Sequence, residues 1–179
     1  MGKAAFALGA QHAEAVRVVD HQPGIVTLGQ REKQRQRREV AERLAQSRGL
    51  LESPSDVAPF ARLVVHVYGE HLGRWGAGIA LLASLERLPC WDGSAAAAGA
   101  VTRSIAVLRY AAGDSAAVAD LSAEDRITVL ATASSAFAGM KEYRRAIAAY
   151  AEALQLAAAG LPAGSVAVRA LAVGGNNLA

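Results

Sequence analysis

The sequence predicts an all-α fold built from antiparallel helix pairs, stacked one on the next. Hydrophobic residues make up 53% of the 179 residues but aromatic residues only 5%, and alanine is abundant, which favours helices that pack closely through small side chains. Apolar residues recur at steps of three and four, the spacing of one helix face. Glycine and proline stand at intervals that divide the chain into segments of similar length.

The chain is long enough for one domain with a sizeable core. We expect residues 1–53 to form an N-terminal segment with a basic, partly solvated helix. Residues 54–179 should form helical repeats, the last of them incomplete. Near the start, residues 4–19 can form a short helix, which Pro23 and Gly24 then interrupt.

A charged helix is predicted from Arg31 towards Gly49. Seven basic and four acidic residues lie between positions 31 and 52, so the whole formal net charge of +3 arises there. No apolar residue precedes Val40 in this helix, so its first half should be solvated or disordered, with Val40 and Leu44 as the only anchors. The basic bias is local and does not by itself indicate a nucleic-acid-binding surface.

The first two helices of the repeats follow the turn stretch "LESPSD". Ser55 or Asp56 should cap the first helix, which is predicted to end near Gly73, because glycine readily adopts the left-handed conformation of a helix end. The second helix follows with almost no loop, from residue 74 until Pro89 stops it.

Three more helices and the beginning of another are predicted further along the chain. The first of them has an apolar face made of Val101, Ile105, Leu108 and Ala112. Ser122 and Asp125 resemble a capping box that opens a helix closing at Gly139. The next helix runs over residues 141–159, and "SVAVRALAVGGNNLA" then starts a last one.

The helix over residues 141–159 repeats the pattern of an earlier helix. Large and small side chains alternate along its apolar stripe, which consists of Tyr143, Ala146, Ile147, Tyr150, Ala153 and Leu154. An offset of 68 residues pairs Trp75 with Tyr143, Gly78 with Ala146, Ile79 with Ile147, Leu82 with Tyr150 and Leu85 with Ala153. That offset is twice 34 residues, the period of the tetratricopeptide repeat. Small residues would let neighbouring helices approach, and aromatic residues would fill the gaps between units.

The pattern Ala146-x3-Tyr150, with Tyr143 before it and Phe137 in the preceding helix, resembles the tetratricopeptide family. The earlier unit fits the same motif at Tyr68, Trp75, Ile79 and Leu82, with Gly78 at the alanine site. The unit between them, roughly 93–126, has Arg109, Gly113 and Asp114 where the motif has packing residues, so its second helix should be degenerate. The stretch "RALAVGGNNLA" is similar to the first helix of kinesin light chain repeats. The resemblance covers about residues 54–179.

This resemblance implies an α-solenoid in which the first helix of each pair lines a concave, partner-binding surface. Arg62, His66 and Glu70 form a polar stripe at i, i+4 and i+8 of the first predicted helix, opposite its apolar face. The resemblance places these three residues and Asn176 on the concave surface. An ordinary surface pairing at i, i+4 remains an alternative. The matching stretch of the later unit lacks the Lys and Arg residues of a carboxylate clamp.

No catalytic, cofactor-binding or metal-binding residue is predicted. His66, Glu70 and His71 do not have the HExxH or HxxEH spacing of zinc enzymes, and no second cluster supplies further ligands. Cys90 has no histidine near it in the sequence. The glycines of "GRWGAG" follow a helix, whereas a phosphate-binding loop follows a strand. We therefore expect that the chain is not an enzyme.

The function expected is a non-enzymatic scaffold that binds a protein or peptide on the concave surface. The alternative is the helical sensor or regulatory part of a nucleic-acid-associated regulator, in which residues 31–48 contact phosphates; the salt dependence of binding would separate the two. Nucleic acid is the less expected partner, because acidic residues interleave with the basic ones and aromatic residues are absent there. No cofactor and no membrane association are expected, since no apolar run reaches about 20 residues. A single cysteine fits a reducing, cytoplasmic location.

The last predicted helix is apolar and has no second helix to close its unit. Repeat arrays need a terminal cap with a polar outer side. We therefore expect that the natural chain continues, or that this C-terminal helix is covered by a partner or by a second copy in a homo-oligomer.

Overall fold

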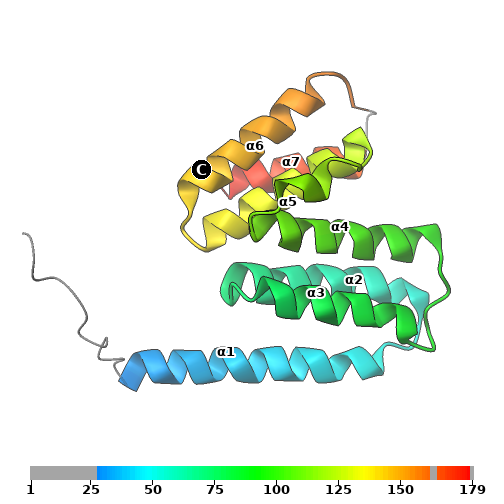
Figure 1. The fold of residues 1–179 in the computed structure, drawn as a ribbon, viewed down its shortest axis with the longest axis vertical. Helices are drawn as coiled ribbons and strands as arrows, with labels where there is room; N and C mark the ends of the chain where they lie inside the picture. Colours follow the sequence, from blue (N-terminus) through cyan, green and yellow to red (C-terminus); the bar gives the residue numbers. More distant parts are fainter. Residues whose placement is uncertain (1–27, 162–164, 178–179) are drawn as a thin grey trace, which may run out of the picture. The chain divides into compact units, whose positions relative to one another are not determined.

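The computed structural model describes residues 28–161 and 165–177, and all regular structure in these ranges is helical (Figure 1). The α-helices are α1 (Leu28–Ser47), α2 (Pro54–Val64), α3 (Trp75–Ala83), α4 (Ala95–Ala111), α5 (Ala123–Gly139), α6 (Tyr143–Ala157) and α7 (Val166–Asn176). Short helices are η1 (Arg48–Leu50), the π-helix η2 (Val65–His71), η3 (Ser84–Arg87) and η4 (Ser115–Val118). The all-α class is confirmed. The helix predicted over residues 4–19 lies outside the described residues.

The chain divides into two compact units, residues 1–35 and residues 36–179. Helix α1 begins in the first unit and ends in the second. In the first unit, Arg35 Nη2 lies 3.2 Å from Glu32 Oε1, an exposed ion pair one turn apart on α1. Such a pair supports an exposed helix by only about 0.2–0.5 kcal/mol.

Within the second unit, the end of α1 is anchored by one of its two predicted residues and by one that was not predicted. Leu44 is buried as expected, but Val40 is 51% exposed, and Ala41 is buried in its place. The reason is a close backbone approach: the buried Tyr68 donates a hydrogen bond from its hydroxyl to the Ala41 carbonyl oxygen at 3.2 Å. A small side chain at position 41 lets the tyrosine reach the helix backbone.

Helix α2 begins two residues earlier than predicted. Ser53 is the N-cap, with Pro54 in the first turn of the helix, where proline's missing N–H costs nothing. The Ser53 backbone N–H donates to Asp56 Oδ2 at 3.0 Å. Asp56 therefore stabilises the helix start from the third helical position, and the prediction that Ser55 or Asp56 is itself the cap is wrong.

The first predicted helix does end at Gly73, which has a φ of 60°, but its last two turns are a π-helix. The Leu72 N–H donates to the Val67 carbonyl oxygen at 3.1 Å, which is an i to i+5 bond. Helix α3 then returns along α2 and η2 after a turn of three residues. This arrangement matches the predicted helix pair.

The remaining helices of the second unit stack in order (Figure 1). Helix α4 packs against both α2 and α3, α5 packs against α4, and both α6 and α7 pack against α5. The connection between α4 and α5 contains one short helix, η4. The degenerate second helix of the unit at roughly 93–126 was expected there. Helix α5 begins at the predicted cap, where Ser122 Oγ accepts from the Asp125 N–H at 3.1 Å, and ends at the predicted Gly139.

Two faces are shifted from their predicted positions. On α4, Val101 and Leu108 are buried as expected, but Ala111 rather than Ala112 completes the face. On α6, the buried residues are the small ones, Ala146, Ala149 and Ala153. The large residues Tyr143 and Ile147 are 56% and 60% exposed, and Leu154 is also exposed.

The predicted stripe on α6 is therefore only half buried. Alanine side chains let α6 lie close to α5, and that closeness leaves the bulkier residues along its outer edge. Tyr150 is partly buried and donates from its hydroxyl to the Leu171 carbonyl oxygen of α7 at 2.9 Å. Tyr150 thus packs against α7, whereas Tyr143 is exposed.

Candidate binding groove

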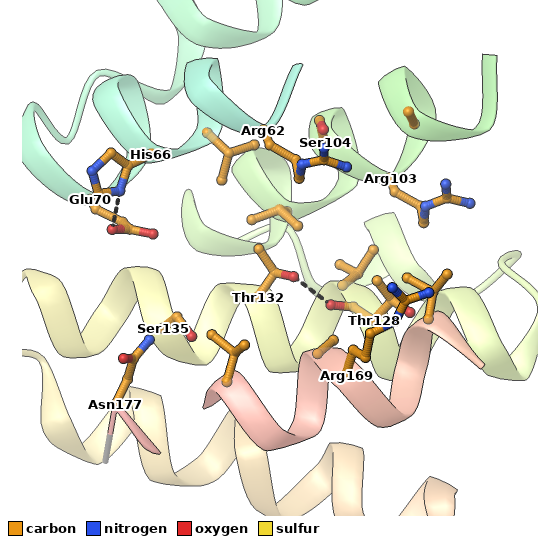
Figure 2. Close-up of a pocket in the computed structure, with 17 residues that line it drawn as sticks. Arg62, His66, Glu70, Arg103, Ser104, Thr128, Thr132, Ser135, Arg169 and Asn177 are labelled. Carbon is orange, nitrogen blue, oxygen red and sulfur yellow. Dashed lines mark hydrogen bonds and ion pairs between the residues drawn. The ribbon is translucent and has the colours of Figure 1, made fainter. Parts of the chain in front are cut away.

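A groove of about 730 Å³ lies within the second unit (Figure 2). Its lining comes from α2 and η2 on one side, from α4 and α5, and from α7 on the opposite side. The lining residues are Arg62, Val65, His66, Glu70, Ala100, Arg103, Ser104, Val107, Thr128, Val129, Thr132, Ser135, Val166, Arg169, Ala170, Val173 and Asn177. A space of this size, open along one side, accommodates several residues of a peptide or a small molecule.

Apolar side chains form much of the lining. Val65, Val107 and Val129 are buried and belong to α2–η2, α4 and α5 respectively. Val166 and Val173 of α7 are exposed by half or more, and they face the same space. A ligand that covers these α7 side chains would remove apolar surface from water.

Three hydroxyl side chains of α5 line the groove at i, i+4 and i+7. Thr128 and Thr132 donate to the carbonyl oxygens of Glu124 and Thr128 at 2.9 and 2.7 Å. Ser135 donates more weakly to the Ala131 carbonyl oxygen, at 3.4 Å. Their hydrogens are therefore used within the helix, and their oxygens remain available to accept hydrogen bonds from a ligand.

The charged residues of the groove are mostly positive. Arg62, Arg103 and Arg169 come from α2, α4 and α7, and Glu70 is the one carboxylate among the lining residues. Figure 2 shows Arg169 on the opposite side of the groove from Arg62 and Arg103. Arg103 Nη1 lies 2.9 Å from Asp125 Oδ1, with both side chains about one-third exposed.

Arg103 thus has an acidic partner, Asp125, whereas Arg62 and Arg169 have none among the described residues. Within the described ranges, neither of these two guanidinium groups has an ion pair. Arginine recognises carboxylates in a planar, two-point geometry. The groove therefore favours a ligand with negative charge.

The structure brings three of the four predicted site residues together. Arg62, His66 and Glu70 all line the groove, on successive turns of α2 and η2. Asn176 is not among the lining residues, and its neighbour Asn177 is. The groove-facing residues of α7 recur at helical steps from Val166 through Val173 to Asn177, so position 176 falls on a different side of the helix.

Sequence reasoning missed Arg103 and Arg169. Each lies on a predicted helix, but the basic residues of a carboxylate clamp were expected in the α5 stretch, which has none facing the groove. The available signal was that α2, α4 and α7 each contain arginine, one in α2 and in α7 and two in α4. Only the packing of these helices shows that the three side chains converge.

His66, Glu70 and His71 form a compact cluster at the end of η2. His66 Nδ1 lies 2.6 Å from Glu70 Oε2, and His66 Nε2 lies 3.0 Å from His71 Nε2. The two imidazole rings are nearly perpendicular, at 82°, with centroids 4.4 Å apart. The zinc motifs considered in the sequence belong to regular α-helices, whereas this segment is π-helical, so a different set of side chains shares one face.

A comparison of the chain with protein-family models, curated proteins and solved structures finds no match. The tetratricopeptide resemblance therefore stays a prediction that rests on the residues quoted for it. None of the described helices is long and apolar enough to cross a membrane.

Proposed function

We propose that the chain is a non-enzymatic scaffold of the tetratricopeptide type, which holds a segment of another protein in the groove. One observation carries the proposal: the lining comes from α2–η2, α4, α5 and α7, and α3 and α6 contribute none of it. In the pairs α2–α3 and α5–α6, it is the first helix that faces the groove. That is the side on which the family resemblance locates partner binding.

The chemistry of the lining indicates an extended segment with acidic and small apolar side chains. Arg62 and Arg169 would bind carboxylates from opposite sides of the groove, and the valines would cover apolar side chains between them. The serine and threonine oxygens of α5 would accept hydrogen bonds from backbone N–H groups of the segment. A negatively charged segment would also be attracted over a distance, so its association should weaken as salt increases.

The test is selection of peptides on the immobilised full-length chain from a random display library, followed by fluorescence anisotropy with the selected peptides. We expect the selected sequences to be enriched in Asp and Glu. Arg62→Glu and Arg169→Glu should each weaken binding by about tenfold, the effect of losing roughly 1.4 kcal/mol. Raised salt should weaken the wild-type complex and leave the variants less affected.

Arg144→Glu is the matched control. Arg144 is an exposed arginine of α6 and is not part of the groove lining, so the same charge reversal there should change affinity by less than about twofold. Equal losses for Arg144→Glu and the groove variants would show a non-specific charge effect. Selected peptides that bind all three variants like the wild type would locate binding outside the groove.

The nucleic-acid alternative has less support. Residues 35–40 of α1 are exposed and include basic side chains, but Arg35 already pairs with Glu32, and Glu39 follows on the same helix. If the chain were a nucleic-acid-associated regulator, deletion of residues 1–38 would abolish binding of a duplex oligonucleotide, and its affinity would fall steeply with salt. The scaffold proposal expects peptide binding to survive that deletion.

Association of two copies through the C-terminal helix is part of the proposal. Val168 of α7 is 43% exposed and lies outside the groove lining, and the exposed residues Tyr143, Ile147 and Leu154 lie on neighbouring α6. A two-fold contact would cover both apolar faces at once. Light scattering should show a dimer that dissociates in Ile147→Glu; a wild-type monomer at high concentration would contradict this.

A cytoplasmic location of the protein stays a prediction.

A further inference from the structure

The π-helix η2 brings together two histidines that a regular helix would keep apart. Residues five positions apart point about 140° away from each other on an α-helix. In η2 the hydrogen bonds join i and i+5, so His66 and His71 lie one above the other, with their Nε2 atoms 3.0 Å apart. The ligand-type atoms of His66, Glu70 and His71 all lie within 4.8 Å of one another.

Glu70 determines which nitrogen of His66 has a free lone pair. Its Oε2 lies 2.6 Å from His66 Nδ1, so this nitrogen is the protonated one and donates to the carboxylate. The lone pair of His66 is then on Nε2, directed towards His71. A carboxylate that accepts from the second nitrogen of a histidine is the usual support of a metal-bound imidazole.

We propose that His66 Nε2 and His71 Nε2 bind one divalent transition-metal ion, with Glu70 as the positioning residue behind His66. A metal between the two nitrogens takes the place of the hydrogen bond that otherwise joins them. His71 then keeps its proton on Nδ1, so both rings bind as neutral ligands. Water fills the remaining coordination positions.

The distance between the nitrogens selects the kind of ion. With metal–nitrogen bonds of about 2.0–2.1 Å, a 3.0 Å separation corresponds to an angle of about 91–97° at the metal. That angle suits adjacent positions of a square-planar or octahedral ion, which Cu²⁺ and Ni²⁺ prefer. A tetrahedral Zn²⁺ needs a separation of roughly 3.4 Å, so the rings would have to move apart. The affinity order should be Cu²⁺, then Ni²⁺, then Zn²⁺.

The cluster is both accessible and partly preorganised. The His66 side chain is 52% exposed, so an ion can reach it from solvent, whereas Glu70 is only 20% exposed. A Cβ atom on Gly139 of α5 would lie 3.4 Å from the Glu70 Cβ, which shows that α5 packs directly on this residue. The carboxylate is therefore held in place before an ion arrives. Metal binding at these residues requires no peptide in the groove.

The experiment is isothermal titration calorimetry of the full chain with NiCl₂, CuCl₂ and ZnCl₂. A Cys90→Ser background is used, because a free thiol binds all three ions and reduces Cu²⁺. One ion should bind per chain. His66→Ala and His71→Ala should each weaken Ni²⁺ binding by at least about tenfold, and Glu70→Gln by about 10–100-fold. The metal-free melting temperatures of these variants should stay near the wild-type value, which separates loss of ligation from loss of fold.

The controls use the other two histidines of the sequence, His12 and His21. His12→Ala with His21→Ala should leave the affinity unchanged. Electron paramagnetic resonance of the Cu²⁺ form should show two imidazole nitrogens, reduced to one in His71→Ala. Wild-type affinity in His71→Ala, loss of binding in the His12 and His21 variant, or tightest binding of Zn²⁺ would each overturn the proposed site.

Discussion

A Cβ atom added to Gly78 of α3 would lie 2.9 Å from the Cβ of Tyr68 in η2 and 2.8 Å from Leu108 Cδ1 of α4. The two helices of this pair therefore meet almost backbone to backbone. A leucine tip can rotate away, but a Cβ next to the main chain cannot. The family resemblance assigns Gly78 to the alanine site of its motif, but at this position even alanine is too large.

Gly78→Ala should therefore destabilise the protein. The extra methyl group forces α3 away from η2 and α4, which costs about 1–3 kcal/mol, typical of an overpacked core. Chemical denaturation followed by circular dichroism measures the change. Gly76→Ala is the matched control, because Gly76 is exposed on the same helix and its Cβ would meet nothing within 4 Å. It should be neutral or stabilise by about 0.5–1 kcal/mol, and stabilisation by both substitutions would contradict the close contact.

Leu44 and Val40 should behave differently although they lie one turn apart on α1. Leu44→Ala removes a buried side chain and should cost about 2 kcal/mol or more, whereas Val40→Ala changes an exposed one and should cost under about 0.5 kcal/mol. Urea unfolding of both variants tests this. Comparable losses from both substitutions would mean that α1 docks through the Val40 and Leu44 face predicted from the sequence.

Deletion of residues 1–38 should leave the melting temperature nearly unchanged. The side chains described between residues 35 and 40 are exposed, and the buried anchors Ala41 and Leu44 remain in the shortened chain. Differential scanning calorimetry measures the effect. A fall of more than about 8 °C would show that the deleted segment contributes to the fold.

Tyr150 and Tyr143 lie on the same helix and should contribute unequally. Tyr150→Phe loses the hydrogen bond to the Leu171 carbonyl oxygen and should cost about 0.5–1.5 kcal/mol. Tyr150→Ala also loses ring packing against α7 and should cost roughly 2–3 kcal/mol. Tyr143→Ala, at an exposed position, should cost under about 0.5 kcal/mol, and amide exchange of α7 should rise only in the Tyr150 variants.

Tyr110 should ionise at a higher pH than an ordinary tyrosine. Burial raises the pKa of Tyr110 above its usual value of 10.0, and the nearby Glu152 carboxylate raises it further. Because the folded pKa is higher than the unfolded one, the stability that neutral Tyr110 contributes is complete below about pH 10 and is lost as pH rises through the folded pKa. In an absorbance titration, Tyr110→Phe should lose phenolate signal in the range above about pH 10. An unchanged titration curve would refute the shift.

Local signals in the sequence determined the class of the fold and most helix ends. Gly73 has a φ of 60° and ends its helix where the sequence predicts, because a left-handed residue closes a helix using only its immediate neighbours. The cap at Ser122 acts over three residues. The polar stripe of Arg62, His66 and Glu70 is likewise visible in the sequence, since helical spacing alone aligns it.

Only the tertiary structure decided which faces are covered and which side chains meet. Whether Tyr143 or Ala149 of α6 is buried depends on the angle at which α5 crosses it, and that angle depends on side chains from both helices. Arg103 and Arg169 are 66 residues apart in the sequence and line one groove because α4, α5 and α7 stack. His66 and His71 share a face because the backbone hydrogen bonds of η2 join residues five positions apart. The first two outcomes depend on contacts between distant segments, and the third depends on a backbone hydrogen-bond pattern. Side-chain spacing along one helix encodes neither.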